Sequence, residues 1–273
     1  MDNARIRQNL LGIADETDKQ KFFDNSRRKA PQMAPITLGS YDYLSRKFSS
    51  RFHSRIARFL EKLHFGKLLR QKKIILKEIR GKENLNSVAN EGALVTCNQS
   101  DPFDSYAAYL ALKSILKRKP LYKLIDEEKM ATTAGKQGYI LRHAATLPIP
   151  TALSCLSDLV GAIRTLYESN NKILVFPEKG QIGDFKQPRA LRPEIFRFAA
   201  RENKPIIPIF ITLEDSKFKD SDNLPVQEYT VHVCPPIFPE KELSVKANAI
   251  KMCEANEKLW ADVYKNFYHT DIK

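Results

Sequence analysis

A polar block in the first half of the chain has the residue types and the setting of a catalytic loop. The block runs from Asn98 through Gln99 to Asp104, after the apolar run 93–96 and before an apolar helical pattern at 106–116. This pattern predicts a strand–loop–helix unit, in which the loop can carry chemistry on a rigid scaffold. A carboxylate such as Asp104 can orient a neighbouring group. The Gln99 amide can form hydrogen bonds to a substrate, but it cannot act as a base near neutral pH.

A second polar block follows another apolar run. Phe176, Pro177 and Glu178 come directly after residues 173–175, which predicts that Glu178 emerges at the end of a strand. Four cations follow: Lys179, Lys186, Arg189 and Arg192. Any one of them alone fits a solvated surface. As a cluster beside a carboxylate they favour a functional site, and Lys and Arg are able to bind phosphate through charge-assisted hydrogen bonds.

Together these blocks resemble the signature of the glycerolipid acyltransferases, which include the 1-acylglycerol-3-phosphate and lysophospholipid acyltransferases. The resemblance covers about residues 70–268, with four blocks in the family's order. These are residues 98–104, 145–151, 175–178 and 207–209. The stretch 186–200 is similar to a branch of the family common in Gram-positive bacteria.

The resemblance implies transfer of an acyl chain from acyl-CoA or acyl carrier protein, as co-substrate, to lysophosphatidate or a related lysophospholipid. It implies no other cofactor and no metal. The family's catalytic His corresponds to Gln99 here, and its orienting Asp corresponds to Asp104. The implied substrate-binding residues are Asn98, Phe176, Pro177, Glu178, Lys179, Lys186, Arg189 and Arg192.

Because Gln99 stands at the position of the catalytic His, two functions are expected. Gln99 predicts an acyltransferase whose activity is weak or lost; the alternative is a catalytically silent member that binds lipid or a partner. Among the five histidines, His143 is the one that the family pattern places near the cleft, as a replacement base or as a structural residue. The block at 98–104 also fits a plain turn in which Asp104 caps the next helix. Thr151 and Lys179 depart from the family's pattern in segments that contact substrate.

Charge is concentrated near one end of the chain. The protein has 273 residues and a net charge of +13, and residues 41–82 hold 13 Lys and Arg against three acidic residues. This asymmetry predicts an anionic partner, either a membrane surface or nucleic acid. No nucleic-acid motif accompanies the charge, so an anionic membrane is favoured.

The same region has the pattern of an amphipathic helix. Apolar residues recur at helical spacing from Leu44 to Leu63, with Phe48 and Phe52 among them, and basic residues lie largely off this stripe. The pattern is typical of a helix at a membrane interface, and it also fits a helix packed on its own domain with a solvated basic face. No apolar run approaches the ~20 residues of a membrane span, and residues 1–5 do not begin a signal peptide. We therefore expect a cytoplasmic protein, peripheral on the membrane.

The remaining pattern alternates strands with helices and predicts an α/β fold, a mostly mixed sheet flanked by helices. The boundaries predict a polar extension at 1–40, a basic helical region at 41–70 and an acyltransferase-like domain at 71–273. Residues 227–233 alternate in polarity, which predicts an edge or antiparallel strand. The four cysteines lack metal-ligand spacing and are expected to be buried thiols. Predicted strands are 74–79, 93–97, 121–125, 146–149, 172–176, 206–212 and 227–233. Predicted helices are 6–13, 105–117, 127–137, 153–168, 194–203 and 243–267.

Overall fold

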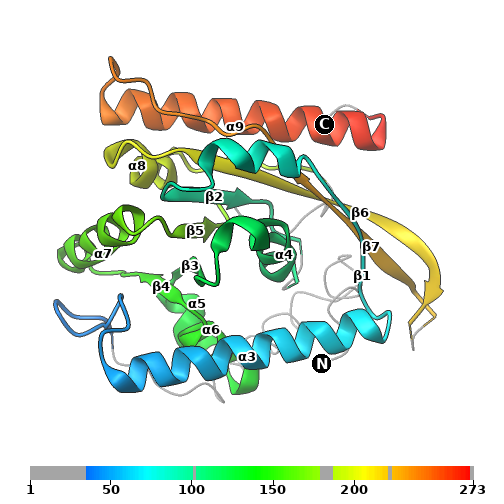
Figure 1. Ribbon diagram of the computed structural model, residues 1–273, viewed down its shortest axis with the longest axis horizontal. Helices are drawn as coiled ribbons and strands as arrows, with labels where there is room; N and C mark the ends of the chain where they lie inside the picture. Colours follow the sequence, from blue (N-terminus) through cyan, green and yellow to red (C-terminus); the bar gives the residue numbers. More distant parts are fainter. Residues whose placement is uncertain (1–34, 101–102, 179–186, 221–222, 271–273) are drawn as a thin grey trace, which may run out of the picture.

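The computed structural model describes residues 35–100, 103–178, 187–220 and 223–270. Its centre is a seven-stranded β-sheet with helices on both faces (Figure 1). The strands are β1 (Ile75–Arg80), β2 (Ala93–Cys97), β3 (Leu121–Asp126), β4 (Thr146–Ile149), β5 (Lys172–Val175), β6 (Ile206–Lys219) and β7 (Pro225–Val233). Each begins within two residues of its predicted start. The predicted helix at 6–13 and most of the polar extension lie outside the described residues.

The sheet is mixed, as predicted. Its order is β1-β7-β6-β2-β5-β3-β4, and the five strands from β6 to β4 are parallel. β7 runs antiparallel to β6, and β1 pairs with β7 in parallel. The antiparallel direction of β7 is confirmed, but an edge position for it is wrong, because β7 lies between β1 and β6.

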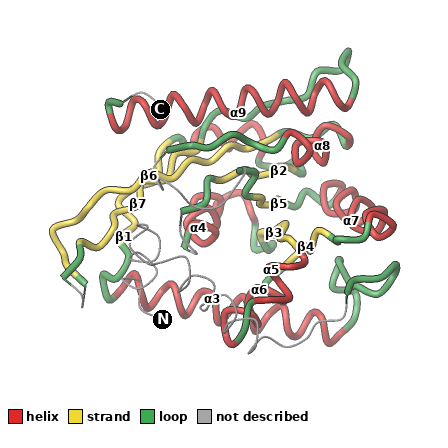
Figure 2. The backbone as a smooth tube through the Cα atoms, turned by 180° about the vertical axis from the view of Figure 1, so that it is seen from behind, coloured by secondary structure: helices red, strands yellow, loops and turns green. Residues whose placement is uncertain are grey.

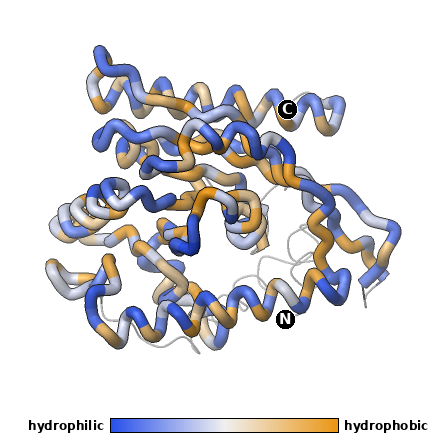
Figure 3. Tube along the Cα trace, viewed as in Figure 1, coloured by the Kyte–Doolittle hydropathy of each residue, from blue (hydrophilic) through white to orange (hydrophobic). Residues whose placement is uncertain are grey.

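Helices cover both faces of the sheet and bury its central strands. Along β2, Ala93 and Val95 pack in one hydrophobic cluster with α3 and α4, whereas Leu94 packs in the other with α7, α8 and α9. Because neighbouring side chains of a strand point to opposite faces, a strand buried on both faces is a continuous apolar run. Figure 3 shows these hydrophobic central strands. The helices are α3 (Phe48–Arg70), α4 (Asp104–Leu116), α5 (Glu127–Thr132), α6 (Gly135–His143), α7 (Leu156–Glu168), α8 (Pro193–Arg201) and α9 (Val245–Tyr268), with short 3₁₀ helices η1 (Lys82–Val88) and η2 (Leu153–Cys155).

One predicted helix is two helices. The chain leaves the helical conformation at Thr133, which is extended, and Gly135 has a φ of +64°. Gly138 then passes so close to Thr133 that a Cβ would lie 2.0 Å from the Thr133 carbonyl oxygen. The predicted helix at 127–137 is therefore wrong: the apolar spacing is right, but the backbone turns between α5 and α6.

The basic helix α3 lies on the opposite side of the molecule from α9 (Figures 1 and 2). Its inward face buries Ala57 and Phe65. Between them, Glu61 forms a salt bridge with Lys123 of β3, in which the side chains are only 12% and 11% exposed. A pair so well shielded from water needs both partners.

Removing one member of this pair should destabilise the protein. Lys123→Met should lower the free energy of unfolding by about 3 kcal/mol, because Glu61 stays buried without its counter-charge. The double variant Glu61→Leu/Lys123→Met should recover most of that loss. Urea unfolding measures both. Lys77→Met is the control, because its salt bridge with Glu214 is exposed and should contribute less than about 1 kcal/mol. Equal losses in the single and double variants would contradict the argument.

Candidate functional site

Asn98 fixes the start of the candidate loop to the neighbouring strand. It follows β2 directly and is 3% exposed. Its Nδ2 donates to the Ile211 carbonyl oxygen at 3.0 Å, and its Oδ1 accepts from the Ile211 backbone N–H at 2.7 Å. These bonds continue the pairing of β2 with β6, which ends at Cys97 and Ile209. The side chain predicted to bind substrate thus bonds the backbone of Ile211 through both of its polar atoms.

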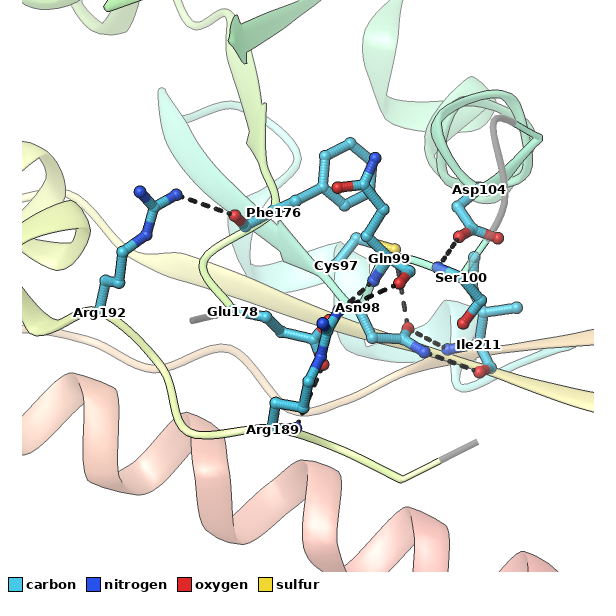
Figure 4. A network of polar contacts seen from close by, with 10 residues as sticks. All are labelled: Cys97, Asn98, Gln99, Ser100, Asp104, Phe176, Glu178, Arg189, Arg192 and Ile211. Atoms are coloured by element: carbon cyan, nitrogen blue, oxygen red, sulfur yellow. Dashed lines mark hydrogen bonds and ion pairs between the residues drawn. The ribbon is translucent and has the colours of Figure 1, made fainter. Parts of the chain in front are cut away.

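Glu178 joins the two predicted blocks. Its carboxylate accepts the backbone N–H of Gln99 at 3.1 Å and forms a salt bridge with Arg189 at 2.8 Å (Figure 4). The backbone N–H of Arg189 donates to the same carboxylate at 3.3 Å, and its guanidinium donates to the Gln99 carbonyl oxygen at 3.4 Å. The Glu178 side chain is 5% exposed and that of Arg189 is 26% exposed. The structure therefore brings Gln99, Glu178 and Arg189 together.

Arg192 lies beside this network and bonds the backbone of the second block. The backbone N–H of Arg192 donates to the Pro177 carbonyl oxygen at 2.9 Å, and its guanidinium donates to the Phe176 carbonyl oxygen at 3.5 Å. Its Nε is buried without a hydrogen-bond partner among the described residues. Lys179 and Lys186, the other two predicted cations, lie outside the described residues.

The side chains of Gln99 and Asp104 point in different directions. In Figure 4 the Gln99 side chain extends away from Asp104, whose carboxylate lies at the backbone of Ser100. Asp104 Oδ2 accepts the Ser100 N–H at 2.6 Å. Asp104 is fully buried and is the first residue of α4, where Phe103 holds the capping position. The simple alternative of Asp104 as the helix cap is therefore wrong. Its carboxylate accepts the N–H of Ser100, which precedes the helix, so that it bridges the two ends of the loop.

Two other side chains with possible catalytic chemistry are Cys97 and His143. The first is buried, and the second lies in a different part of the structure. Burial and the nearby carboxylates of Asp104 and Glu178 raise the pKa of the Cys97 thiol well above its ordinary value, which disfavours the thiolate that a nucleophilic cysteine needs. His143 stacks on His53 with ring centroids 5.1 Å apart, between α6 and α3. It belongs to that ring cluster and not to the network of Gln99, Glu178 and Arg189.

Sequence reasoning missed two supports of the site. Ile211 contributes only backbone groups, which no residue pattern reveals. Glu257 on α9 accepts the backbone N–H of Leu191 at 2.7 Å and so fixes the segment between Arg189 and Arg192. Glu257 lies in an amphipathic helix among other charged residues, where nothing local distinguishes it. The four cysteines are buried and free, as predicted.

The arrangement brings together hydrogen-bond donors, a carboxylate and two cations, with an amide at position 99. Gln99 can donate to or accept from a substrate oxygen, and Arg189 and Arg192 supply positive charge. None of these groups removes a proton from a hydroxyl near neutral pH.

Comparison with known proteins relates the chain to an acyltransferase by fold. It is similar to the crystal structure of the 1-acyl-sn-glycerophosphate (LPA) acyltransferase PlsC from Thermotoga maritima, with a TM-score of 0.53 and 16% sequence identity. The match covers 85% of this chain and 87% of that one. No family model matches the chain, and no curated protein matches it by sequence. The chain therefore has an acyltransferase-like fold.

Asn98 offers a direct test of the loop's support. Asn98→Ala should lower the free energy of unfolding by about 2 kcal/mol, because the buried Ile211 groups lose their partners. Asn98→Asp should keep the contact with the Ile211 N–H and lose the one with its carbonyl oxygen. Thermal unfolding measures both. Asn86→Ala, at an exposed position in η1, is the control. An Asn98→Ala protein as stable as the parent would show that the two bonds contribute nothing.

Proposed function

We propose that this chain belongs functionally with the lysophospholipid acyltransferases. Its substrates would be an acyl thioester, either acyl-CoA or acyl carrier protein, and lysophosphatidate or a related lysophospholipid. The observation that carries the proposal is the contact of Gln99 with Glu178 and Arg189, which follow it by 79 and 90 residues. These residues come together in an acyltransferase-like fold. The order of the sequence blocks supports the same assignment.

The proposed reaction needs a proton acceptor that position 99 does not supply. The acceptor hydroxyl oxygen would bond to the acyl carbon, the thioester C–S bond would break, and the hydroxyl proton would end on the thiolate. Gln99 can position the hydroxyl or the thioester carbonyl by hydrogen bonding. Loss of general-base catalysis removes about 10²–10⁴-fold in rate, so this chain would be a feeble enzyme.

Arg189 and Arg192, with Lys179 and Lys186, would bind the phosphate of the acceptor. Arg189 already pairs with Glu178, which neutralises part of its charge and holds its guanidinium in place. Arg192 has a buried Nε beside the backbone of Phe176 and Pro177. In this proposal Glu178 acts mainly by positioning Gln99 and Arg189.

A second candidate function is lipid or partner binding without catalysis. The observation that favours it is the separation of Gln99 from Asp104. The Asp104 carboxylate accepts the Ser100 N–H, and the Gln99 side chain extends away from it (Figure 4). A loop in which Asp104 holds the backbone can form a binding site for a lipid or a partner, and binding does not require a general base.

The outward face of α3 would hold the protein on an anionic membrane. Four large apolar side chains are exposed there: Phe48 by 79%, Phe52 by 53%, Phe59 by 65% and Leu63 by 48%. At 3.6 residues per turn they lie within roughly 60° of one helix face. Arg51, Arg55 and Lys62 are exposed around them. Apolar insertion and attraction to acidic headgroups together give reversible binding.

The structure bears on membrane contact in one further respect. Among the described helices, none is long and apolar enough to cross a bilayer. The proposed association is peripheral, on the cytoplasmic face.

Restoring a base tests the proposed reaction. Gln99→His should raise turnover of lysophosphatidate with acyl-CoA by about 10²-fold or more, because an imidazole can take the hydroxyl proton. Single-turnover assays compare it with the parent and with Gln99→Asn, an amide control that should show no gain.

The other outcomes are also informative. Robust and equal activity in the parent and in Gln99→His would place the base elsewhere, with His143 tested first. No activity in either, with lysophosphatidate bound in calorimetry, would favour the silent member. No activity and no binding would reject the acyl-transfer proposal and leave partner binding as the second candidate function.

Vesicle co-sedimentation tests the membrane contact. Phe48→Ser/Phe52→Ser should sharply reduce binding to phosphatidylglycerol vesicles, because the inserted apolar area is lost. Binding of the parent should weaken as salt shortens the screening length from ~10 Å at 0.1 M toward ~3 Å at 1 M. The matched control is Val245→Ser/Ile250→Ser, which removes two exposed apolar residues from α9. Binding that ignores lipid charge, or that survives the change in α3, would reject this contact.

A further inference from the structure

The inward face of α3 reaches the candidate loop through an aromatic cluster. The Phe65 ring lies 5.5 Å from that of Phe103 and 5.1 Å from that of Tyr106, measured between centroids. On the other side of Phe103, the Tyr229 ring of β7 lies at 4.9 Å. Phe65, Phe103, Tyr106 and Tyr229, here named the Phe103 cluster, are each no more than 9% exposed. Three separate elements, α3, α4 and β7, thus meet around one ring.

Phe103 directly precedes the carboxylate that closes the loop. Its carbonyl oxygen accepts the N–H groups of Tyr106 at 2.8 Å and Ala107 at 2.9 Å, which form the first turn of α4. The next residue, Asp104, is fully buried and holds the Ser100 N–H. The Phe103 ring therefore packs at the start of α4, next in sequence to the carboxylate that holds the Ser100 N–H.

The two faces of α3 have different contacts. Phe65 lies roughly 130° around the helix from the centre of the exposed set of Phe48, Phe52, Phe59 and Leu63. The helix is rigid between these faces, and packed interiors transmit displacement because they contain few voids. A force that fixes the exposed face also fixes the position of the Phe65 ring.

We propose that Phe65 is a positioning residue for the candidate site, through which contact of α3 with an anionic membrane holds the Asp104 carboxylate against the Ser100 N–H. This inference rests on the proposed membrane contact and adds to it. The bilayer both holds the protein and, by seating α3, presses Phe65 against Phe103. The hydrogen bond between Ser100 and Asp104 is then held best when the lipid substrate is nearby.

Exchange of single backbone amides with solvent tests this in the full-length protein. The Ser100 N–H is held by Asp104, and the Gln99 N–H is held by Glu178. Phosphatidylglycerol vesicles should slow exchange at Ser100 several-fold in the parent, and phosphatidylcholine vesicles should not. Gln99 serves as the internal reference, because its bond to Glu178 does not pass through Phe103.

Phe65→Leu separates the proposed role from general stability. It keeps an apolar side chain but removes the ring contacts with Phe103 and Tyr106. It should bind vesicles as the parent does and lose the vesicle-dependent slowing at Ser100. A purely structural role would speed exchange equally with and without vesicles. Leu68→Ala, which removes apolar volume one turn later on the same helix and core, should retain the slowing.

The outcomes separate this inference from the proposed function. Slowing in the parent and in Leu68→Ala, with none in Phe65→Leu, supports it. Equal slowing in Phe65→Leu overturns it, as does vesicle binding by the parent with no change at Ser100. Failure of the parent to co-sediment with phosphatidylglycerol vesicles overturns the membrane contact and this inference together. The acyl-transfer proposal is judged separately, by the Gln99→His assay.

Discussion

A buried carboxylate must be paired, and the pairing of Glu178 organises the candidate site. With its side chain only 5% exposed, Glu178 would be costly as an isolated charge. Its partners are the backbone N–H groups of Gln99 and Arg189 and the Arg189 guanidinium. Gln99 belongs to the loop after β2, whereas Glu178 and Arg189 both lie in the segment that follows β5. Satisfying one charge therefore brings the loops after β2 and β5 into a single arrangement.

The loops after β2 and β5 come together at one end of the sheet. β2 and β5 are neighbours and parallel, so the loops that follow them emerge at the same end. Asn98 extends the pairing of β2 with β6, and Glu257 of α9 holds the segment after Arg189. Most of the polar groups near the proposed substrate are thus engaged by the protein's own backbone. Such engagement pre-organises a site and limits how far its groups move on binding.

Helix α3 links this site to the proposed membrane. Helix α3 has apolar residues on two faces. Among the described residues, the inner face with Phe65 is buried, whereas the outer face with its Phe residues is exposed. The salt bridge of Glu61 with Lys123 and the Phe103 cluster attach that face to β3 and α4. A lipid surface would satisfy the outer face, because it offers both apolar depth and negative charge.

The sequence alone determined the strands and most of the helices, because apolar periodicity records which faces are buried. The meeting of the two polar blocks was expected from the family resemblance and not from periodicity. It also specified the amide at position 99, which limits chemistry in any fold. Tertiary structure decided three things that local pattern cannot contain. The helix predicted at 127–137 breaks because Gly138 must pass close to Thr133. Asp104 turns to Ser100, since that N–H lies within hydrogen-bonding distance of its buried carboxylate. The large apolar residues of α3 face outward because its inner face closes on β3 and α4 through Ala57, Glu61 and Phe65, and that choice depends on partners distant in the chain.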